Sequence, residues 1–163
     1  MGILADLFGD AMFEGRPVPH TGPEAARLVS VLYGSGRAAS RALGIPESTL
    51  RGWRKGVTPK GESAQKIQLL ARAAAPGIRD AYDGSSKLAI KATVQFSGDR
   101  RDRIIHPGRY IPRPLMRRII TTWVQGKDRT VETLLHNAIQ THYFNTDATE
   151  ALVYMQPTDA WFE

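Results

Sequence analysis

Residues 36–55, GRAASRALGIPESTLRGWRK, constrain the fold more than any other part of the chain. Two short helices that cross closely need small side chains inside the first helix, and Ala39 and Ser40 supply them. A tight turn between such helices needs a glycine, because the backbone has a positive φ there, and Gly44 meets this need. Ile45 follows as the apolar anchor of the turn. The stretch therefore predicts two short crossing helices.

The second helix of this pair combines an apolar face with a polar and basic one. Leu50 and Trp53 are three residues apart, so both are expected to point inward. The other positions are then expected to face outward: Glu47, Ser48, Thr49, Arg51, Gly52, Arg54 and Lys55. Serine, threonine and arginine side chains contact base edges or phosphates when such a helix lies in the major groove of DNA. The pattern favours a helix-turn-helix motif over a plain helical hairpin in a bundle.

The net charge of +6 is distributed in blocks. Residues 34–66 contain seven basic and two acidic residues, and residues 100–118 contain seven basic and one acidic residue. Residues 128–163 contain one basic and six acidic residues. A basic chain favours a polyanionic partner, most often nucleic acid. We therefore expect DNA as the partner, contacted by Ser48, Thr49, Arg51, Arg54, Lys55, Lys60, Arg100, Arg101, Arg103, Arg117 and Arg118.

These candidates divide into two kinds of contact. Arg51 and Arg54 are expected to reach base edges, since arginine makes a bidentate contact to guanine. Lys55 and Lys60 are expected to contact phosphates, which position the protein without selecting a sequence.

Residue types that the chain lacks exclude several classes of protein. With no cysteine, the 163 residues cannot form a disulfide scaffold, a cysteine-ligated zinc site or a thiol nucleophile. His136 and His142 are six residues apart, on different faces of a predicted helix, and make a poor metal pair. The sequence contains no HExxH, Walker or GxSxG motif. We expect no cofactor, no metal site and no self-contained enzyme.

The sequence also predicts where the protein resides. No apolar run approaches the roughly 18 residues that a membrane-spanning helix needs. The first residues, MGILADLFGDAMFEG, lack the basic region of a secretory signal. We expect a cytoplasmic protein that is associated with the nucleoid and has no membrane partner.

Three segments are predicted along the chain. Residues 1–22 form an N-terminal arm, and residues 23–83 form a helical DNA-binding domain. After a break at DGSS, residues 87–163 form a small domain with a basic loop and an acidic final strand. Apolar and polar residues alternate from Leu88 to Ser97, which is typical of a half-buried strand. The predicted fold class is α+β, with an N-terminal all-α helix-turn-helix domain followed by a β-β-α-α-β domain.

This layout resembles that of the telomere terminal proteins of linear, Streptomyces-type actinobacterial chromosomes and plasmids. In the first domain the resemblance is carried by RALGIPESTLRGWRKG. In the second it is carried by IKATVQF, RRDR, IPRPLMRRI and THYFNTD. The resemblance covers most of the chain and depends on order and pattern. HPGRY and the C-terminal MQPTDAWFE depart from the pattern of the family.

The resemblance implies a protein that caps the 5′ ends of linear DNA through a phosphodiester bond to a side-chain hydroxyl and primes replication there. It implies two partners, a telomere-associated protein and a DNA polymerase, and the polymerase would bring the metal ions. The accepting hydroxyl needs cationic groups beside it. Ser97 is the first candidate because it ends the predicted strand next to the arginines, Thr93 is the second and Tyr110 the third.

Two other functions fit the same sequence. A transcriptional repressor or plasmid copy-control regulator would use its C-terminal domain to form a homodimer or to bind a ligand, and its operator would be an inverted repeat. An adaptor would bind another protein through its acidic end. The basic stretch 100–118 and the hydroxyls beside it favour the terminal protein, because a repressor has no need of them.

Overall fold

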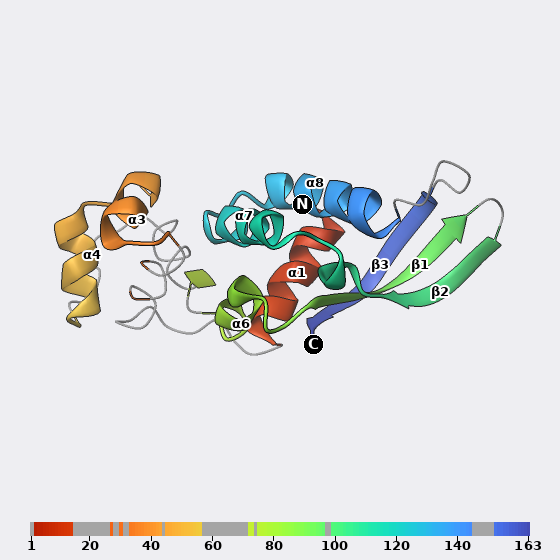
Figure 1. Ribbon diagram of the computed structural model, residues 1–163, viewed down its shortest axis with the longest axis horizontal. Coiled ribbons are helices and arrows are strands. Elements are labelled where there is room, and N and C mark those ends of the chain that lie inside the picture. The colour runs from red at the N-terminus through yellow and green to blue at the C-terminus, as the bar shows by residue number, and fades with distance from the viewer. Residues whose placement is uncertain are drawn as a thin grey trace.

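The computed structural model describes residues 2–14, 27, 30, 33–43, 45–56, 72–73, 75–96, 99–144 and 152–163. Three strands in this part of the chain form an antiparallel sheet in the order β2-β1-β3 (Figure 1). The central strand is β1 (Leu88–Phe96), and its neighbours are β2 (Asp99–Ile105) and β3 (Leu152–Phe162).

Strand β1 is half-buried, as its alternating sequence predicts. Ile90, Ala92 and Val94 are almost completely buried, whereas the residues between them are exposed or half-buried. Ile90 lies opposite Ile105 of β2 and Ala160 of β3, which are also buried. One face of the sheet therefore contributes to the core, and the other face is largely polar.

Helix α1 (Ile3–Phe13) packs against β3 and against α8 (Asp128–Ala138), as Figure 1 shows. Its buried side chains recur at helical spacing, which gives the helix one apolar face. These side chains are Leu4, Ala5, Phe8, Ala11 and Met12.

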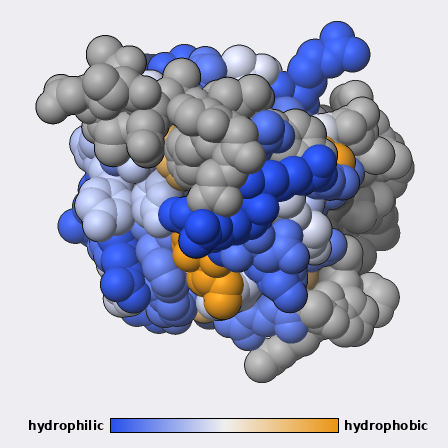
Figure 2. Space-filling view, turned by 90° about the vertical axis from the view of Figure 1, so that its right-hand side faces the viewer, coloured by the Kyte–Doolittle hydropathy of each residue, from blue (hydrophilic) through white to orange (hydrophobic). Residues whose placement is uncertain are grey.

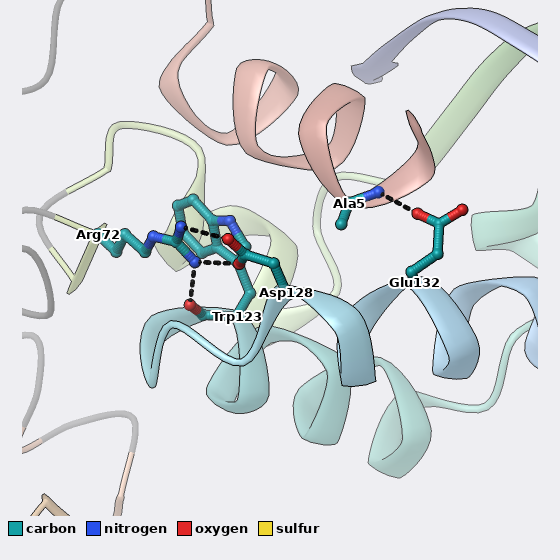
Figure 3. A network of polar contacts seen from close by, with 5 residues as sticks. All are labelled: Ala5, Arg72, Trp123, Asp128 and Glu132. Atoms are coloured by element: carbon teal, nitrogen blue, oxygen red, sulfur yellow. Dashed lines mark hydrogen bonds and ion pairs between the residues drawn. The ribbon is translucent and has the colours of Figure 1, made fainter. Parts of the chain in front are cut away.

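A carboxylate on α8 holds the start of α1. Oε2 of Glu132 accepts a hydrogen bond from the backbone N–H of Ala5, with a distance of 2.7 Å (Figure 3). The first N–H groups of a helix have no partner within the helix, and the positive end of the helix dipole favours a negative charge. Glu132 meets both requirements and so stabilises the position of α1 relative to α8.

Helix α7 (Arg113–Val124) packs against α8 and carries the centre of an aromatic cluster, Trp123. The ring of Trp123 meets the rings of Phe8 and Phe13 edge to face, with centres 6.0 Å and 5.6 Å apart. Phe8 meets Phe162 of β3 in the same way, at 5.7 Å. Such pairs stabilise a core beyond the area they bury. The cluster therefore joins α1, α7 and β3.

Arg72 connects a segment before β1 to the same cluster. Its guanidinium carbon lies 5.0 Å from the centre of the Trp123 ring, and Nη1 donates a hydrogen bond to the Trp123 carbonyl oxygen at 2.7 Å. Two further hydrogen bonds reach the two carboxylate oxygens of Asp128, at 2.6 Å and 3.0 Å (Figure 3). A bidentate charged pair with mostly buried side chains is both strong and directional.

The prediction of an all-α N-terminal domain followed by a β-β-α-α-β domain is wrong. Helix α1 packs among the sheet and its helices, and α6 (Ile78–Asp83) packs against α7. The backbone N–H of Gly77 also donates to the carbonyl oxygen of Met12 at 2.9 Å. The described residues form a mixed structure, in which a three-stranded antiparallel sheet combines with six helices: α1, α3 (Gly36–Leu43), α4 (Glu47–Arg54), α6, α7 and α8. The apolar face of α1 requires a covering surface, and helical spacing alone does not reveal which surface covers it.

The region after β1 also differs from its prediction. The sequence predicts a basic loop here, but β2 begins at Asp99, so the arginines 100, 101 and 103 lie in a strand. Pro107 then begins the 3-10 turn η1 (Pro107–Arg109). Proline lacks the N–H that a sheet ladder requires, which explains why β2 ends before it. Helix α8 continues as a single π-helical segment, η2 (Ile139–Tyr143).

The position of α1 in the core can be tested with one pair of substitutions. Phe8→Ala removes a side chain that is 1% exposed, so we expect the free energy of unfolding to fall by about 3–5 kcal/mol. Ile3→Ala, at a position on the same helix that is 55% exposed, should change it by less than about 0.5 kcal/mol. Chemical denaturation measures both values. Equal and small effects would contradict the packing of α1 against the sheet.

Candidate nucleic-acid interface

Helices α3 and α4 pack against each other, and residues 39–53 include four buried apolar side chains. Ala39, Ile45, Leu50 and Trp53 are between 0% and 4% exposed. The sequence predicts these two helices and an inward position for each of the four residues, and the structure confirms both. The predicted turn glycine, Gly44, lies outside the described residues.

Local sequence explains where the two helices begin. The Ser35 hydroxyl accepts a hydrogen bond from the backbone N–H of Ala38 at 3.0 Å, as an N-cap serine does. Pro46 precedes α4, and its fixed φ suits the start of a helix. Glu47, in the first turn of α4, interacts favourably with the positive end of the helix dipole.

The outer face of α4 is polar and basic. Ser48, Arg51 and Lys55 are exposed, and Thr49 is half-buried. Residues 45–56 and 33–43 together contain one acidic side chain, Glu47, and five cationic ones: Arg37, Arg41, Arg51, Arg54 and Lys55. This surface has the charge that phosphate contacts need.

Glu47 balances part of that positive charge. Its Oε1 lies 3.7 Å from Nη2 of Arg51, and its Oε2 lies 4.0 Å from Nε of Arg37. Each partner in these pairs is substantially exposed, and exposed ion pairs contribute at most about 1 kcal/mol. A phosphate group can therefore replace Glu47 as the partner of Arg51 at little energetic cost.

Arg54 has different surroundings from Arg51. It is half-buried, and its Nε atom is buried with no hydrogen-bond partner in the described ranges. Its Nη2 atom lies 3.4 Å from the point where a Cβ on Gly36 would be. The sequence predicts a base contact for Arg54, and the structure places the side chain against the start of α3.

The arginines at 100, 101 and 103 are exposed on the edge strand β2. Because side chains alternate along a strand, Arg100 lies on one face of the sheet, and Arg101 and Arg103 lie on the other. The pairing register puts Arg100 on the same face as Thr93. Figure 2 views the end of the molecule where β1 and β2 project, and its surface is predominantly hydrophilic there.

Arg117 and Arg118 of α7, both predicted to contact DNA, differ in their surroundings. Nε of Arg117 donates to the Tyr82 carbonyl oxygen at 3.1 Å, and its guanidinium carbon lies 4.7 Å from the centre of the Tyr82 ring. Arg117 therefore attaches α7 to α6. Arg118 is exposed and stays a candidate for a phosphate contact, while Lys60 lies outside the described residues.

The structure describes two of the three candidate hydroxyl groups, since Ser97 lies outside it. Oγ1 of Thr93 donates a hydrogen bond to Oδ1 of Asp102, on the neighbouring strand, at 2.5 Å. A carboxylate in this position can accept the hydroxyl proton. Tyr110 is 60% exposed, and its ring packs edge to face on Tyr143 with the centres 5.5 Å apart.

Positive charge beside Tyr110 is partly balanced by Glu163. Oε1 of Glu163 accepts a hydrogen bond from Nη2 of Arg109 at 3.0 Å and lies 2.6 Å from Nδ1 of His106. Partial desolvation raises the pKa of Glu163, but the hydrogen bonds and charges of these two partners outweigh it and hold that pKa below its ordinary value. The sequence does not reveal this contact, because 54 residues separate Arg109 from Glu163.

Comparisons of the chain with protein-family models, with curated proteins and with solved structures found no match. Among the helices that the structure describes, none is long and apolar enough to cross a membrane. Within the same described ranges, no three or more His, Cys, Asp or Glu side chains are grouped so that they could hold a metal ion. Function is therefore inferred from the chain's own residues.

The role of α4 can be tested at its exposed arginine. Arg51→Ala should weaken binding to a duplex selected from a random-sequence library by about 1–3 kcal/mol, the value of a bidentate base contact. The free energy of unfolding of this variant should equal that of the wild-type chain, because Arg51 is exposed. Fluorescence anisotropy measures the affinity, and Arg129→Ala on α8 is the matched control. Unchanged affinity in a folded Arg51→Ala variant would contradict the assignment of α4 as the recognition helix.

Proposed function

We propose that the chain is a DNA-binding protein of the helix-turn-helix type. The observation that carries this proposal is the combination of a buried contact between α3 and α4 with an exposed, basic outer face on α4. In this proposal α4 lies in the major groove, where Ser48, Thr49 and Arg51 reach base edges. Arg41 and Lys55 contact the flanking phosphates.

The exposed arginines of β2 support a second contact with nucleic acid. Figure 1 places β2 and α4 at opposite ends of the described residues, so the two surfaces would engage separate stretches of the nucleic acid. We propose that α4 binds a duplex and that Arg100, Arg101 and Arg103 contact phosphates nearer a strand end. Such contacts position the protein and carry no sequence information.

The most specific form of the proposal is a terminal protein of linear DNA, as the resemblance implies. The hydrogen bond from Thr93 to Asp102 supports it, because the hydroxyl already has a carboxylate beside it that can take its proton. In the proposed step, Oγ1 of Thr93 attacks the α-phosphorus of a deoxynucleoside triphosphate. A new oxygen–phosphorus bond forms, pyrophosphate leaves, and the proton moves to Asp102. The partner polymerase supplies the metal ions. Ser97 and Tyr110 are the other candidates.

The contribution of β2 can be measured through the salt dependence of binding. Replacing Arg100, Arg101 and Arg103 together by Gln should reduce the slope of log affinity against log salt. Each lost phosphate contact should reduce the magnitude of this slope by about 0.9 on a duplex and about 0.7 on a single strand. The full chain is needed, because α1 and Arg72 pack against residues that follow β1. Lys127→Gln/Arg129→Gln is the control, and an unchanged slope in the triple variant would show that β2 does not contact nucleic acid.

Covalent attachment is tested with a labelled deoxynucleoside triphosphate and an extract of the host that contains its polymerase. We expect label that survives boiling in detergent, with loss of the label in Thr93→Val/Ser97→Ala/Tyr110→Phe. The single variants identify the accepting residue, and Asp102→Asn should slow labelling if that residue is Thr93. Label that persists in the triple variant would contradict all three sites. A wild-type chain that is never labelled, yet binds an inverted-repeat duplex tightly, would instead support the transcriptional repressor.

A further inference from the structure

A small cavity lies between the turn that joins α6 to β1 and the start of α7. Its volume is about 40 Å³. Its walls combine apolar side chains, including Leu88 and Met116, with polar and charged groups from Gly84, Ser86, Lys87 and Arg113. These four residues belong to the stretch 83–87 and to the first position of α7, neither of which the proposed DNA contacts use.

Two cationic side chains converge on Gly84. This glycine has a φ of +87°, and the point where a Cβ would lie is 3.6 Å from Nζ of Lys87 and 3.8 Å from Nε of Arg113. Within the described ranges, neither cation forms an ion pair like those of Arg72 and Arg109. An anion bound between these two cations would be attracted to both.

Ser86 lines the same cavity. Among the residues that the structure describes, its buried Oγ atom has no hydrogen-bond partner, whereas the neighbouring Ser85 hydroxyl donates to Oδ1 of Asp83 at 2.5 Å. A buried hydroxyl without a partner is unfavourable, so an unpaired one needs an explanation. An oxyanion in the cavity would accept its hydrogen bond.

Backbone features of the walls also favour an anion. Arg113 begins α7, whose first turn contains no acidic residue, so no side chain of that turn neutralises the positive end of the helix dipole. Gly108 lies so close to β1 that a Cβ on it would be 2.2 Å from the backbone nitrogen of Leu88. Only glycine allows this approach, which brings η1 against β1 and forms one wall of the cavity.

Asp83 is the acidic group that interacts with this site. Hydrogen bonds from the side chain and backbone of Ser85 chiefly lower its pKa, and the charges of Arg113 and Arg79 lower it further. Its carboxylate is thus already bound by the turn, with the Ser85 N–H at 2.8 Å. Within the described part of the chain Lys87 has no such partner, so an additional anion is the group that would complete the site.

We propose that this cavity binds a phosphate-type oxyanion through Lys87, Arg113 and the hydroxyl of Ser86. The ligand is a phosphate monoester or inorganic phosphate, since both present several charged oxygens to two cations and one hydroxyl. The source is either the terminal phosphate of a nucleic-acid strand or a free phosphate compound. The site is independent of α4 and β2 and goes beyond the proposed DNA-binding function.

Inorganic phosphate is the first probe, and backbone amide NMR of the full chain is the measurement. Titration with phosphate at constant ionic strength and pH should shift the amides of Gly84, Ser86 and Lys87, and the shifts should saturate. Lys87→Gln/Arg113→Gln should weaken this binding by about tenfold or more, because it removes both charged donors. Lys127→Gln/Arg129→Gln should leave it unchanged. Shifts that match those produced by chloride, or that persist in the Lys87→Gln/Arg113→Gln variant, overturn the proposal.

Ser86→Ala separates a ligand-binding hydroxyl from a structural one. Phosphate binding should weaken several-fold, while the thermal unfolding midpoint stays the same or rises, because the variant loses a buried unpaired hydroxyl. A lower midpoint with unchanged phosphate binding contradicts the role of Ser86.

The source of the phosphate is distinguished with two oligonucleotides of identical sequence, one with a 5′-phosphate and one with a 5′-hydroxyl. A preference for the 5′-phosphate that disappears in Lys87→Gln/Arg113→Gln supports a nucleic-acid end. Equal binding of both, together with saturable phosphate shifts, supports a free phosphate compound. Arg51→Ala should keep the phosphate shifts, so failure of α4 to bind DNA is distinguishable from failure of this site.

Discussion

The ring of Trp123 is the contact on which the arrangement of helices and sheet depends. Phe8 and Phe13 of α1 meet this ring edge to face. The guanidinium of Arg72 lies over the ring and donates a hydrogen bond to the backbone carbonyl oxygen of Trp123. Segments that are far apart in the chain are therefore held at one residue of α7. Since α1 and the helices beside it cover one face of the sheet, the other face stays accessible, and Thr93 lies there.

Three acidic residues of the C-terminal half have partners inside the molecule. Asp128 pairs with Arg72, Glu132 holds the start of α1, and Glu163 contacts His106 and Arg109. An adaptor would need these carboxylates for its partner, so their internal roles do not favour that alternative. On the outer face of α4, one acidic residue accompanies the cations, so this face is basic. Binding of a polyanion is consistent with this distribution of charge.

Proximity in sequence decided which features could be predicted. The inward positions of Ala39, Ile45, Leu50 and Trp53 follow from helical spacing within about fifteen residues, and the alternation along β1 follows from a period of two. Arg117 was expected to contact phosphate, yet it packs on Tyr82 and binds its carbonyl oxygen, 35 residues away. A long basic side chain can either cover an aromatic ring or extend into solvent. The residues next to it in the sequence do not show which of these two placements it takes.

The sequence by itself determined the short elements: the helices α3 and α4 with their inner residues, the strand β1, the surplus of positive charge and the absence of cysteine chemistry. Only the tertiary structure decided that α1 belongs with the sheet, that the three arginines of β2 lie along an edge strand, and that Lys87, Arg113 and Ser86 line one cavity. The physical reason is that local hydrogen bonding and side-chain spacing select a helix or a strand. Which apolar face covers which, and which charges meet, depends on packing between residues that are distant in the chain.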